Sequence, residues 1–360
     1  MSACVDRDRP VSEPSGVQLK IGDRLCGENA PPLMLAEEGQ ANQGDVELAR
    51  RMIELAADAG ADGIEFQLFL ADDMYVRGER GHKIYAACEL SDSSIAELVG
   101  HARAHGLLFQ AACLSPVTAE LCARLDVDSF CVNATDLNNP VILDAVSSLG
   151  KPFWLATLMA TLEEIDWAVE YLERRRATNF GLLHGQHVMT SGSSQGVPPG
   201  MAQLGCIPMF QERYGVVVGY VDHTPTLEMP ALAVARGASI VLKHLSPEPG
   251  WQGPDAGVCL PPEEWKRSKT LFDYSMRTGG RDKSLSQSEI SDRTIHRRSL
   301  YTTRSIAAGE RLAREDLTAL RPSTGGMDPR SLEEIIGRRS VRALGPQHLL
   351  LDSDLGEMGA

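Results

Sequence analysis

The chain has 360 residues, with 35 Lys and Arg against 49 Asp and Glu, which gives a formal net charge of -14. This acidic balance argues against nucleic acids and acidic membrane surfaces as partners, because both are bound through basic patches. No apolar run approaches the ~20 residues that span a bilayer, and the first residues (MSACVDRDRP) lack the layout of a signal peptide, so we expect a cytoplasmic protein.

The cysteines are scattered along the chain without CxxC spacing, so neither a disulfide framework nor a zinc finger is indicated. Most are expected to be reduced and buried. They are Cys4, Cys26, Cys88, Cys113, Cys122, Cys131, Cys206 and Cys259.

Residues 1–30 mix Pro, Ser, Gly, Asp and Arg with little periodicity and are interpreted as an N-terminal extension. From residue 31 the chain alternates apolar segments of strand length with amphipathic segments of helix length, which indicates βα units and a parallel sheet. In the first unit, PLMLAEEG (32–39) leads into DVELARRMIELAADAG (45–60), whose apolar residues have helical spacing. The further predicted strands are 63–69, 107–113, 127–136, 152–157, 180–187, 216–223 and 239–244. The further predicted helices are 91–106, 116–125, 139–149, 161–177, 200–214, 226–236 and 261–277.

These eight units predict a (β/α)8 TIM barrel over residues 31–277. A doubly wound open sheet is the alternative, but it normally has fewer units and often a Gly-rich phosphate loop, and the sequence contains no such loop. Residues 278–296 are polar and aperiodic and are interpreted as a linker. Residues 297–360 contain short alternating strands and a short helix from Pro329 to Ile336, so we expect a small domain that caps or pairs rather than a second enzyme core.

In a TIM barrel the chemistry takes place at the carboxyl ends of the strands. This rule selects Glu37, Glu38, Gln67, Cys113, Asp136, Thr157, His187, His223 and His244. His223 and His244 end neighbouring strands, so their imidazoles could share one divalent cation, although a single histidine is more often a structural hydrogen-bonding group. Glu37 is either a further ligand, a general base, or a carboxylate held by hydrogen bonds in a loop.

Several motifs, taken in order, identify a family. They are AEEGQANQG (36–44), IEFQLF (64–69), MATLEEI (159–165), LLH (182–184), VDHT (221–224), KH (243–244), GPD (253–255), RRSL (297–300) and AAGERLAREDLTALRP (307–322). This series resembles the sialic acid synthase (N-acetylneuraminate synthase) family over roughly residues 31–350. Residues 297–360 are similar to the SAF, or antifreeze-like, domain that follows the barrel in that family.

The resemblance implies a carbohydrate-biosynthetic transferase that condenses phosphoenolpyruvate with an N-acetylated aldose. It implies a divalent metal, usually manganese or magnesium, held at positions matched by His223 and His244. Glu37 and Asp136 match catalytic carboxylates of the family, Asp136 being one methylene shorter than the usual glutamate.

On the sugar side, Gln67 and Asp255 match substrate-binding residues of the family. Arg321 matches an arginine that reaches a neighbouring subunit. The resemblance therefore also implies a homodimer in which each SAF domain covers the partner's barrel.

The phosphoenolpyruvate side departs from the family pattern. Glu65 stands where the family has lysine, Cys131 replaces a second lysine, and Ala111, Ala112 and Ala134 stand where hydroxyl groups are usual. A site for this anion needs cations and hydrogen-bond donors, so the sequence indicates a divergent member that lacks most phosphoenolpyruvate-binding residues, with Glu65 and Cys131 facing a changed substrate. A raised pKa of Glu65, or a new cation, would neutralise this carboxylate and weaken the argument against phosphoenolpyruvate binding.

Cys113, Cys131 and His187 are candidate new functional groups, and the alternative for each is a buried thiol or a loop histidine. Three hypotheses follow. The first is a metal-dependent enzyme that forms a carbon-carbon bond on a sugar-like aldehyde with an altered co-substrate. The second is a barrel enzyme that performs aldol cleavage, isomerisation or hydrolysis without phosphoenolpyruvate. The third is a non-catalytic homologue that keeps the family dimer.

Overall fold

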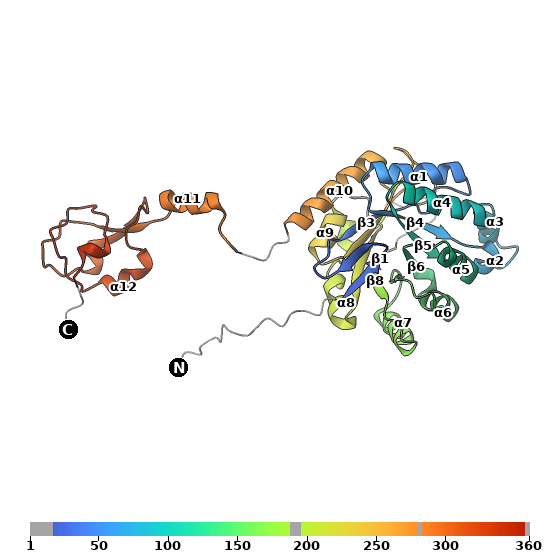
Figure 1. Ribbon diagram of the computed structural model, residues 1–360, viewed down its shortest axis with the longest axis horizontal. Coiled ribbons are helices and arrows are strands. Elements are labelled where there is room, and N and C mark those ends of the chain that lie inside the picture. Colours follow the sequence, from blue (N-terminus) through green and yellow to red (C-terminus); the bar gives the residue numbers. More distant parts are fainter. Residues whose placement is uncertain (1–16, 188–195, 279–282, 357–360) are drawn as a thin grey trace. The chain divides into compact units, whose positions relative to one another are not determined.

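The computed structural model describes residues 17–187, 196–278 and 283–356. The chain divides into two compact units, Met1–Gly280 and Arg281–Ala360, which are described separately below. The first unit is a closed barrel of parallel strands in the order β10-β3-β4-β5-β6-β7-β8-β9 (Figure 1). The strands are β3 (Leu33–Glu37), β4 (Gly63–Leu68), β5 (Leu108–Cys113), β6 (Ser129–Val132), β7 (Phe153–Ala156), β8 (Phe180–Gly185), β9 (Val217–Asp222) and β10 (Ile240–His244).

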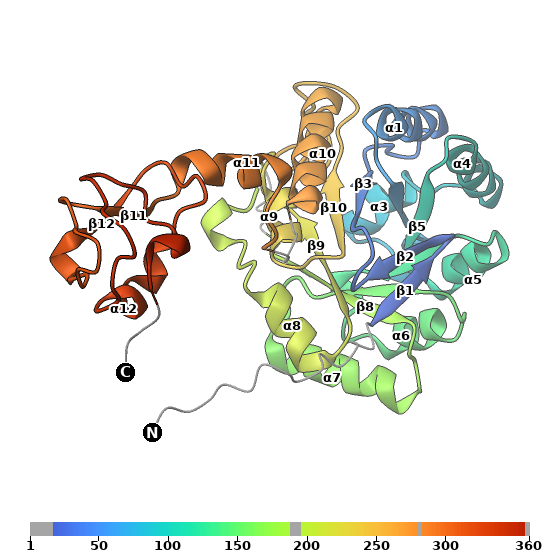
Figure 2. The ribbon, with the colours of Figure 1, turned by 60° about the vertical axis from the view of Figure 1, so that its left-hand side comes forward.

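Helices surround this barrel, and the predicted TIM barrel is confirmed (Figure 2). The helices are α1 (Val46–Asp58), α4 (Asp92–Ala104), α5 (Pro116–Arg124), α6 (Pro140–Ser147), α7 (Leu162–Arg174), α8 (Cys206–Tyr214), α9 (Met229–Ala235) and α10 (Pro262–Arg277). Local sequence sets many of their starts: Asp45, Ser91, Ser115, Asn139 and Thr161 each accept a hydrogen bond from the first turn of the helix that follows.

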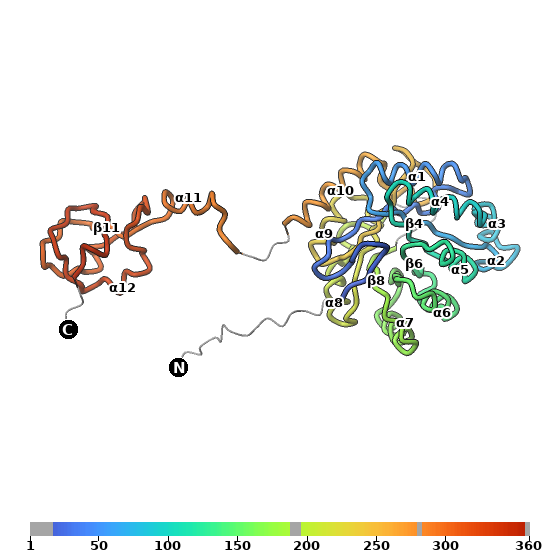
Figure 3. The backbone as a smooth tube through the Cα atoms, viewed as in Figure 1, coloured from blue at the N-terminus to red at the C-terminus, as the bar shows by residue number. Residues whose placement is uncertain are grey.

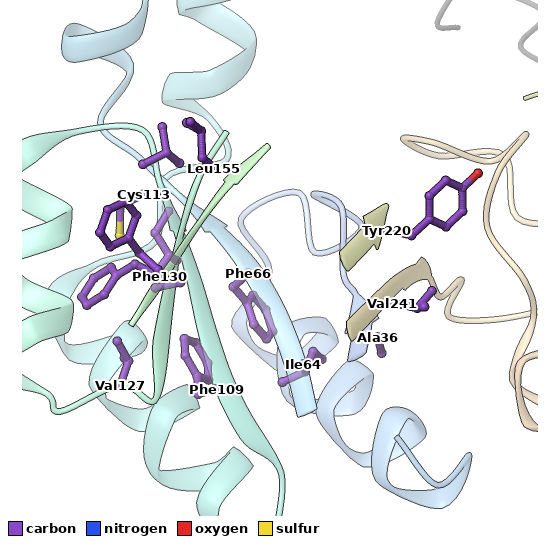
Figure 4. Close-up of a cluster of buried hydrophobic side chains, with 14 of the residues drawn as sticks. Ala36, Ile64, Phe66, Phe109, Cys113, Val127, Phe130, Leu155, Tyr220 and Val241 are labelled. Carbon is purple, nitrogen blue, oxygen red and sulfur yellow. The ribbon is translucent and has the colours of Figure 1, made fainter. Parts of the chain in front are cut away.

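Alternate residues of each strand face opposite sides of the barrel wall, because the side-chain period of a strand is two. On β4, Ile64 and Phe66 pack in the outer layer against the helices, whereas Glu65 and Gln67 face the barrel interior. Phe66 stacks on Phe109 of β5 with ring centroids 5.5 Å apart, and both lie in the cluster drawn in Figure 4. This alternation decides which polar side chains of the strands can reach a common site.

A hairpin of β1 (Gln18–Ile21) and β2 (Arg24–Gly27) closes the opposite end of the barrel from the strand tips that carry the site. Leu19, Ile21 and Cys26 are buried among the inward-facing barrel residues, and the Cys26 thiol lies 3.1 Å from the carbonyl oxygen of Ser239, just before β10. This part of the expected N-terminal extension is therefore folded onto the barrel. Two short helices, α2 (Ala71–Met74) and α3 (Arg80–Ala86), are inserted between β4 and α4 (Figure 3).

The second unit begins with α11 (Gln287–His296), so the expectation that all of residues 278–296 form an aperiodic linker is wrong. Ser286 and Glu289 form a reciprocal capping box that starts this helix. The rest of the unit contains the antiparallel strands β11 (Ser299–Thr302) and β12 (Leu317–Leu320) and the helix α12 (Leu332–Ile335) around a separate apolar core. Across the described parts of the chain, no helix is both long and apolar enough to cross a membrane.

Candidate active site

A cavity of about 300 Å³ opens at the carboxyl ends of the barrel strands. Most of the residues selected from the sequence line it, from strands that lie far apart in the chain. They are Glu37, Glu65, Gln67, Cys131, His187, His223, His244 and Asp255. The parallel barrel brings them together because all strands end at the same face.

His223 and His244 form the most direct contact in this cavity. Their Nε2 atoms lie 3.2 Å apart, both side chains are buried, and neither Nδ1 atom has a hydrogen-bond partner among the described residues. Burial lowers the pKa of His223, and the neighbouring His244 lowers it further; burial also lowers the pKa of His244. Both shifts favour the neutral form of the rings, and a neutral imidazole has one nitrogen lone pair that can bind a metal cation.

This pair fits a divalent cation. Two nitrogens about 2.1 Å from one cation lie about 3 to 3.5 Å apart in tetrahedral or octahedral geometry, which matches the observed separation. Glu37 is a neighbour of the pair. Among the described residues, however, the ligand atoms of Glu37, His223 and His244 do not all lie within 4.8 Å of one another. The protein ligands would therefore be two imidazoles, with the other positions left for substrate and water.

Glu37, at the end of β3, connects the histidine pair to Gln67. Its Oε2 lies 3.2 Å from Nε2 of His244, and its Oε1 accepts a hydrogen bond of 3.3 Å from Nε2 of Gln67. The pKa of Glu37 is raised to about 8, mainly by burial and next by the charge of Asp255. Glu37 can therefore hold or release a proton near neutral pH at the edge of the cavity, as a general acid or base requires.

The loop after β3 presses closely against His244. Gly39 has φ of +56°, and a Cβ atom at this position would lie 2.5 Å from Nδ1 of His244 and 3.1 Å from Oδ2 of Asp255. Only glycine therefore fits here. The adjacent Glu38 is turned away from this chemistry, because its carboxylate accepts hydrogen bonds from the backbone N–H groups of Gln40 and Asn42 and from the Asn42 amide.

The deeper part of the cavity is acidic and apolar. Glu65 is buried, and its Oε2 accepts a hydrogen bond of 2.5 Å from Nε2 of Gln110, whose Oε1 in turn accepts from Oγ of Ser129. Burial raises the pKa of Glu65 to about 8, with Glu37 as the next cause, and burial keeps the pKa of the Cys131 thiol well above its usual value. Cys131 is therefore a neutral thiol in this environment rather than a nucleophilic thiolate.

No Lys or Arg appears among the described residues that line the cavity. Lys243 precedes His244 but has the opposite strand parity, so it points into the outer layer. There its Nζ lies 3.0 Å from Oδ2 of Asp222 and donates to the carbonyl oxygen of Thr224, and both charged side chains are fully buried. This lysine is neutralised in place and does not serve the cavity.

Some candidate residues do not reach the cavity. Cys113 packs in the outer layer with Cys122, because it shares the parity of Phe109 and Ala111. Asp136 lies in a 3-10 turn beyond β6, where its carboxylate accepts from Asn139 and Thr135; its neighbour Thr135 lines the cavity, but Asp136 does not. Thr157 donates to the carbonyl oxygen of Leu183 and is likewise outside the lining.

Two further candidates differ in position. His187 lines the cavity, with its ring centroid 5.3 Å from that of His223. Arg321 belongs to the second unit, where its side chain is exposed.

The structure adds lining residues that the sequence did not indicate. Tyr75 and Tyr85 flank the mouth from the α2–α3 segment, and Asn133, Thr135 and Met159 line it from the loops after β6 and β7. The only sequence feature that indicates these residues as candidates is their position in segments that follow barrel strands.

A second group of potential ligands lies outside the barrel. Glu54 of α1 and His101 and His105 of α4 bring one ligand atom each to within 4.8 Å of one another. This is the only such trio that the described residues form, and it lies on the helical exterior, remote from the strand ends.

Comparison with known proteins agrees with this architecture. A model described as the NeuB family matches residues 52–272, and a SAF domain model matches residues 297–356. The chain is 28% identical to an N,N'-diacetyllegionaminic acid synthase of Campylobacter jejuni, over 86% of this chain and 96% of that protein. It is 26% identical to the N-acetylneuraminate-9-phosphate synthase of Mus musculus, over 88% of this chain and 90% of that protein.

A solved structure gives the same result. The N-acetylneuraminic acid synthetase of Leptospira borgpetersenii, crystallised with citrate, superposes with a TM-score of 0.70 at 26% identity, over 77% of this chain and 95% of that chain. The matched family model covers more than half of the chain and includes seven of the eight barrel strands. The chain therefore belongs to the NeuB family, with a TIM barrel followed by a SAF domain.

Proposed function

We propose that this protein is a metal-dependent enzyme that forms a carbon-carbon bond on a sugar-like aldehyde, using a co-substrate other than phosphoenolpyruvate. The observation that carries the proposal is the pair of neutral, buried imidazoles of His223 and His244, with Nε2 atoms 3.2 Å apart in a cavity at the strand ends. The relatives named above are an N,N'-diacetyllegionaminic acid synthase and an N-acetylneuraminate-9-phosphate synthase, and this likeness supports a sugar-like substrate for the same end of the barrel.

His223 and His244 would hold the cation, with manganese or magnesium expected from the family resemblance. A bound divalent cation supplies Lewis-acid polarisation of a carbonyl oxygen. Glu37, 3.2 Å from Nε2 of His244, is placed to move a proton at its Oε2 atom. Gln67 holds the opposite oxygen of Glu37, so it positions that carboxyl group and presents the rest of its amide to the cavity.

Asp255 faces the same cavity and is suited to accept hydrogen bonds from sugar hydroxyl groups. Asp136 remains a proposed catalytic carboxylate that would require the turn after β6 to move toward the substrate. Arg321 is proposed to complete the site of a partner subunit, within a homodimer whose SAF domains are exchanged.

The altered co-substrate follows from the charge of the cavity. Glu37, Glu65 and Asp255 line it, whereas the described lining residues include neither Lys nor Arg. Because the pKa values of Glu37 and Glu65 are raised to about 8, these two carboxyl groups are mostly protonated near neutral pH, so the argument rests on the absence of basic partners for a multiply charged anion. Each lining carboxyl group that is ionised would add about 4 kcal/mol of repulsion at about 4 Å and an effective dielectric constant of ~20. The lack of basic lining residues is also compatible with the alternative function, a reaction that needs no second substrate, such as aldol cleavage.

Metal stoichiometry tests the proposed site. His223→Ala and His244→Ala should each reduce manganese bound at the barrel to below one tenth of the wild-type amount, measured by elemental analysis after dialysis. The measurement should be made in a His101→Ala/His105→Ala background, because the outer trio with Glu54 offers a competing site. His187→Ala serves as a matched cavity control. Stoichiometric manganese in both His223→Ala and His244→Ala would refute the assignment.

A further inference from the structure

The cavity contains several carboxyl groups but no basic partner for them among its described lining residues. Glu37, Glu65 and Asp255 contribute three carboxyl groups, and the described lining residues contribute no guanidinium or ammonium group.

Glu65 lies at the floor of the cavity in a fixed orientation. Its Oε2 accepts from Nε2 of Gln110, and Oε1 of Gln110 in turn accepts from Oγ of Ser129, so a chain of two hydrogen bonds holds the carboxyl group. The side chain is only 3% exposed, and its neighbours on the floor are apolar or weakly polar: Cys131, Ala134, Ala156, Leu158, Val221 and Leu242. A fixed carboxyl group within an apolar floor is a site for a small cationic or hydrogen-bond-donating group attached to an apolar one.

The mouth of the cavity has a second feature that favours a cationic ligand. Tyr75 and Tyr85 line it with ring centroids 5.1 Å apart at an interplanar angle of 39°, and Phe69 packs edge-on against Tyr85 at 5.0 Å. Faces of tyrosine rings attract cations and not anions. Asp255 adds a carboxylate to the same lining, so an organic cation meets favourable groups from the mouth to the floor.

We infer that the cavity binds a ligand that carries a protonated amine, with the ammonium group paired to Glu65 and its carbon skeleton on the apolar floor. This inference rests on the proposed function in one respect: the aldehyde is assigned to the histidine pair, so the amine is assigned to the rest of the cavity. The amine-bearing molecule then occupies the part of the cavity where an anionic co-substrate would meet Glu65. Binding involves no covalent step, since the contact is an ion pair supported by the Gln110 hydrogen bond.

Three probes of equal length test the charge preference: n-butylamine, n-butanol and butyrate. Binding to the metal-free full chain at pH 7.5 is measured by ligand-observed NMR titration. We expect butylamine to bind at least 10-fold more tightly than butyrate, with butanol between them. Glu65→Gln should remove the preference for butylamine while leaving butanol unchanged, and Glu65→Lys should favour butyrate.

Glu54→Gln is the matched control, because it removes a carboxyl group from the outer helical layer, and it should keep the wild-type order of the probes. Folding of each variant is checked by near-UV circular dichroism. Butyrate binding as tightly as butylamine, an amine preference that survives Glu65→Gln, or no detectable binding of any probe at 50 mM would each overturn the inference. In His223→Ala the amine preference should persist, so failure of the metal assignment and failure of this inference give different results.

Discussion

Nε2 of His223 and Nε2 of His244 face each other at 3.2 Å across neighbouring strands, and Glu37 approaches His244 from the other neighbouring strand at the same distance. Nε2 of His244 thus lies between Nε2 of His223 and Oε2 of Glu37, and Oε2 of Glu37 has no hydrogen-bond partner among the residues the structure describes. Buried polar atoms in such contacts need a proton or a metal cation between them, which either a ring N–H or a bound cation supplies.

Gly39→Ala should damage the metal site without touching a ligand. The new Cβ atom would lie 2.5 Å from Nδ1 of His244, so the imidazole must shift, and we expect manganese affinity to fall at least 10-fold by calorimetric titration. Gly60→Ala is the control, because Gly60 also has a positive φ, +82°, but a Cβ atom there meets nothing within 4 Å. Equal affinity losses in the two variants would show that general backbone strain is the cause.

Asp222→Asn should strongly destabilise the barrel. It leaves the ammonium group of Lys243 fully buried without its carboxylate partner at 3.0 Å, and breaking such a pair costs about 3 to 5 kcal/mol. Asp166→Asn removes the half-exposed partner of Arg213 and should cost less than about 1 kcal/mol. Urea unfolding followed by tryptophan fluorescence measures both, and equal losses would contradict the structural role of the buried pair.

Glu65→Gln should change how the stability of the metal-free protein depends on pH. Burial raises the pKa of Glu65 from 4.5 to about 8 on folding, so between these values the folded state binds a proton that the unfolded chain has released. The free energy of unfolding contributed by Glu65 is therefore present below about pH 4.5 and is lost as the pH rises towards 8.

The measurement is urea unfolding at pH 5.5 and pH 8.0. Glu65→Gln should lose less stability between these pH values than the wild type does, whereas the surface variant Glu54→Gln should behave like the wild type. An unchanged pH dependence in Glu65→Gln would mean that Glu65 titrates near its ordinary pKa.

The barrel could be predicted from the sequence because each strand is a short apolar run followed by an amphipathic helix. Strand parity was harder to assign. Cys113 and Cys131 both lie near strand ends, yet Cys113 faces the helices and Cys131 faces the cavity. In a parallel barrel both faces of a strand are buried, so the apolar pattern does not distinguish inside from outside.

Other features depended on tertiary contacts or on weak local signals. The β1–β2 hairpin is stabilised by burial of Leu19 and Ile21 against the barrel, which no local pattern reveals. The spacing of Ser286 and Glu289 is typical of a capping box and indicates the start of α11. The polar composition of the segment favoured its interpretation as a linker. Tyr75 and Tyr85 come from short helices without clear periodicity, so their place at the mouth follows only from the folded chain.

Calorimetric titration of the manganese-loaded wild-type protein with phosphoenolpyruvate tests the central claim most directly. The protein should show no saturable binding at micromolar concentrations, because Glu65 and Cys131 face the cavity and the described lining has no basic side chain. The double variant Glu65→Lys/Cys131→Lys should gain affinity for the anion and provides the positive comparison. A micromolar Kd for phosphoenolpyruvate in the wild-type protein would contradict the account.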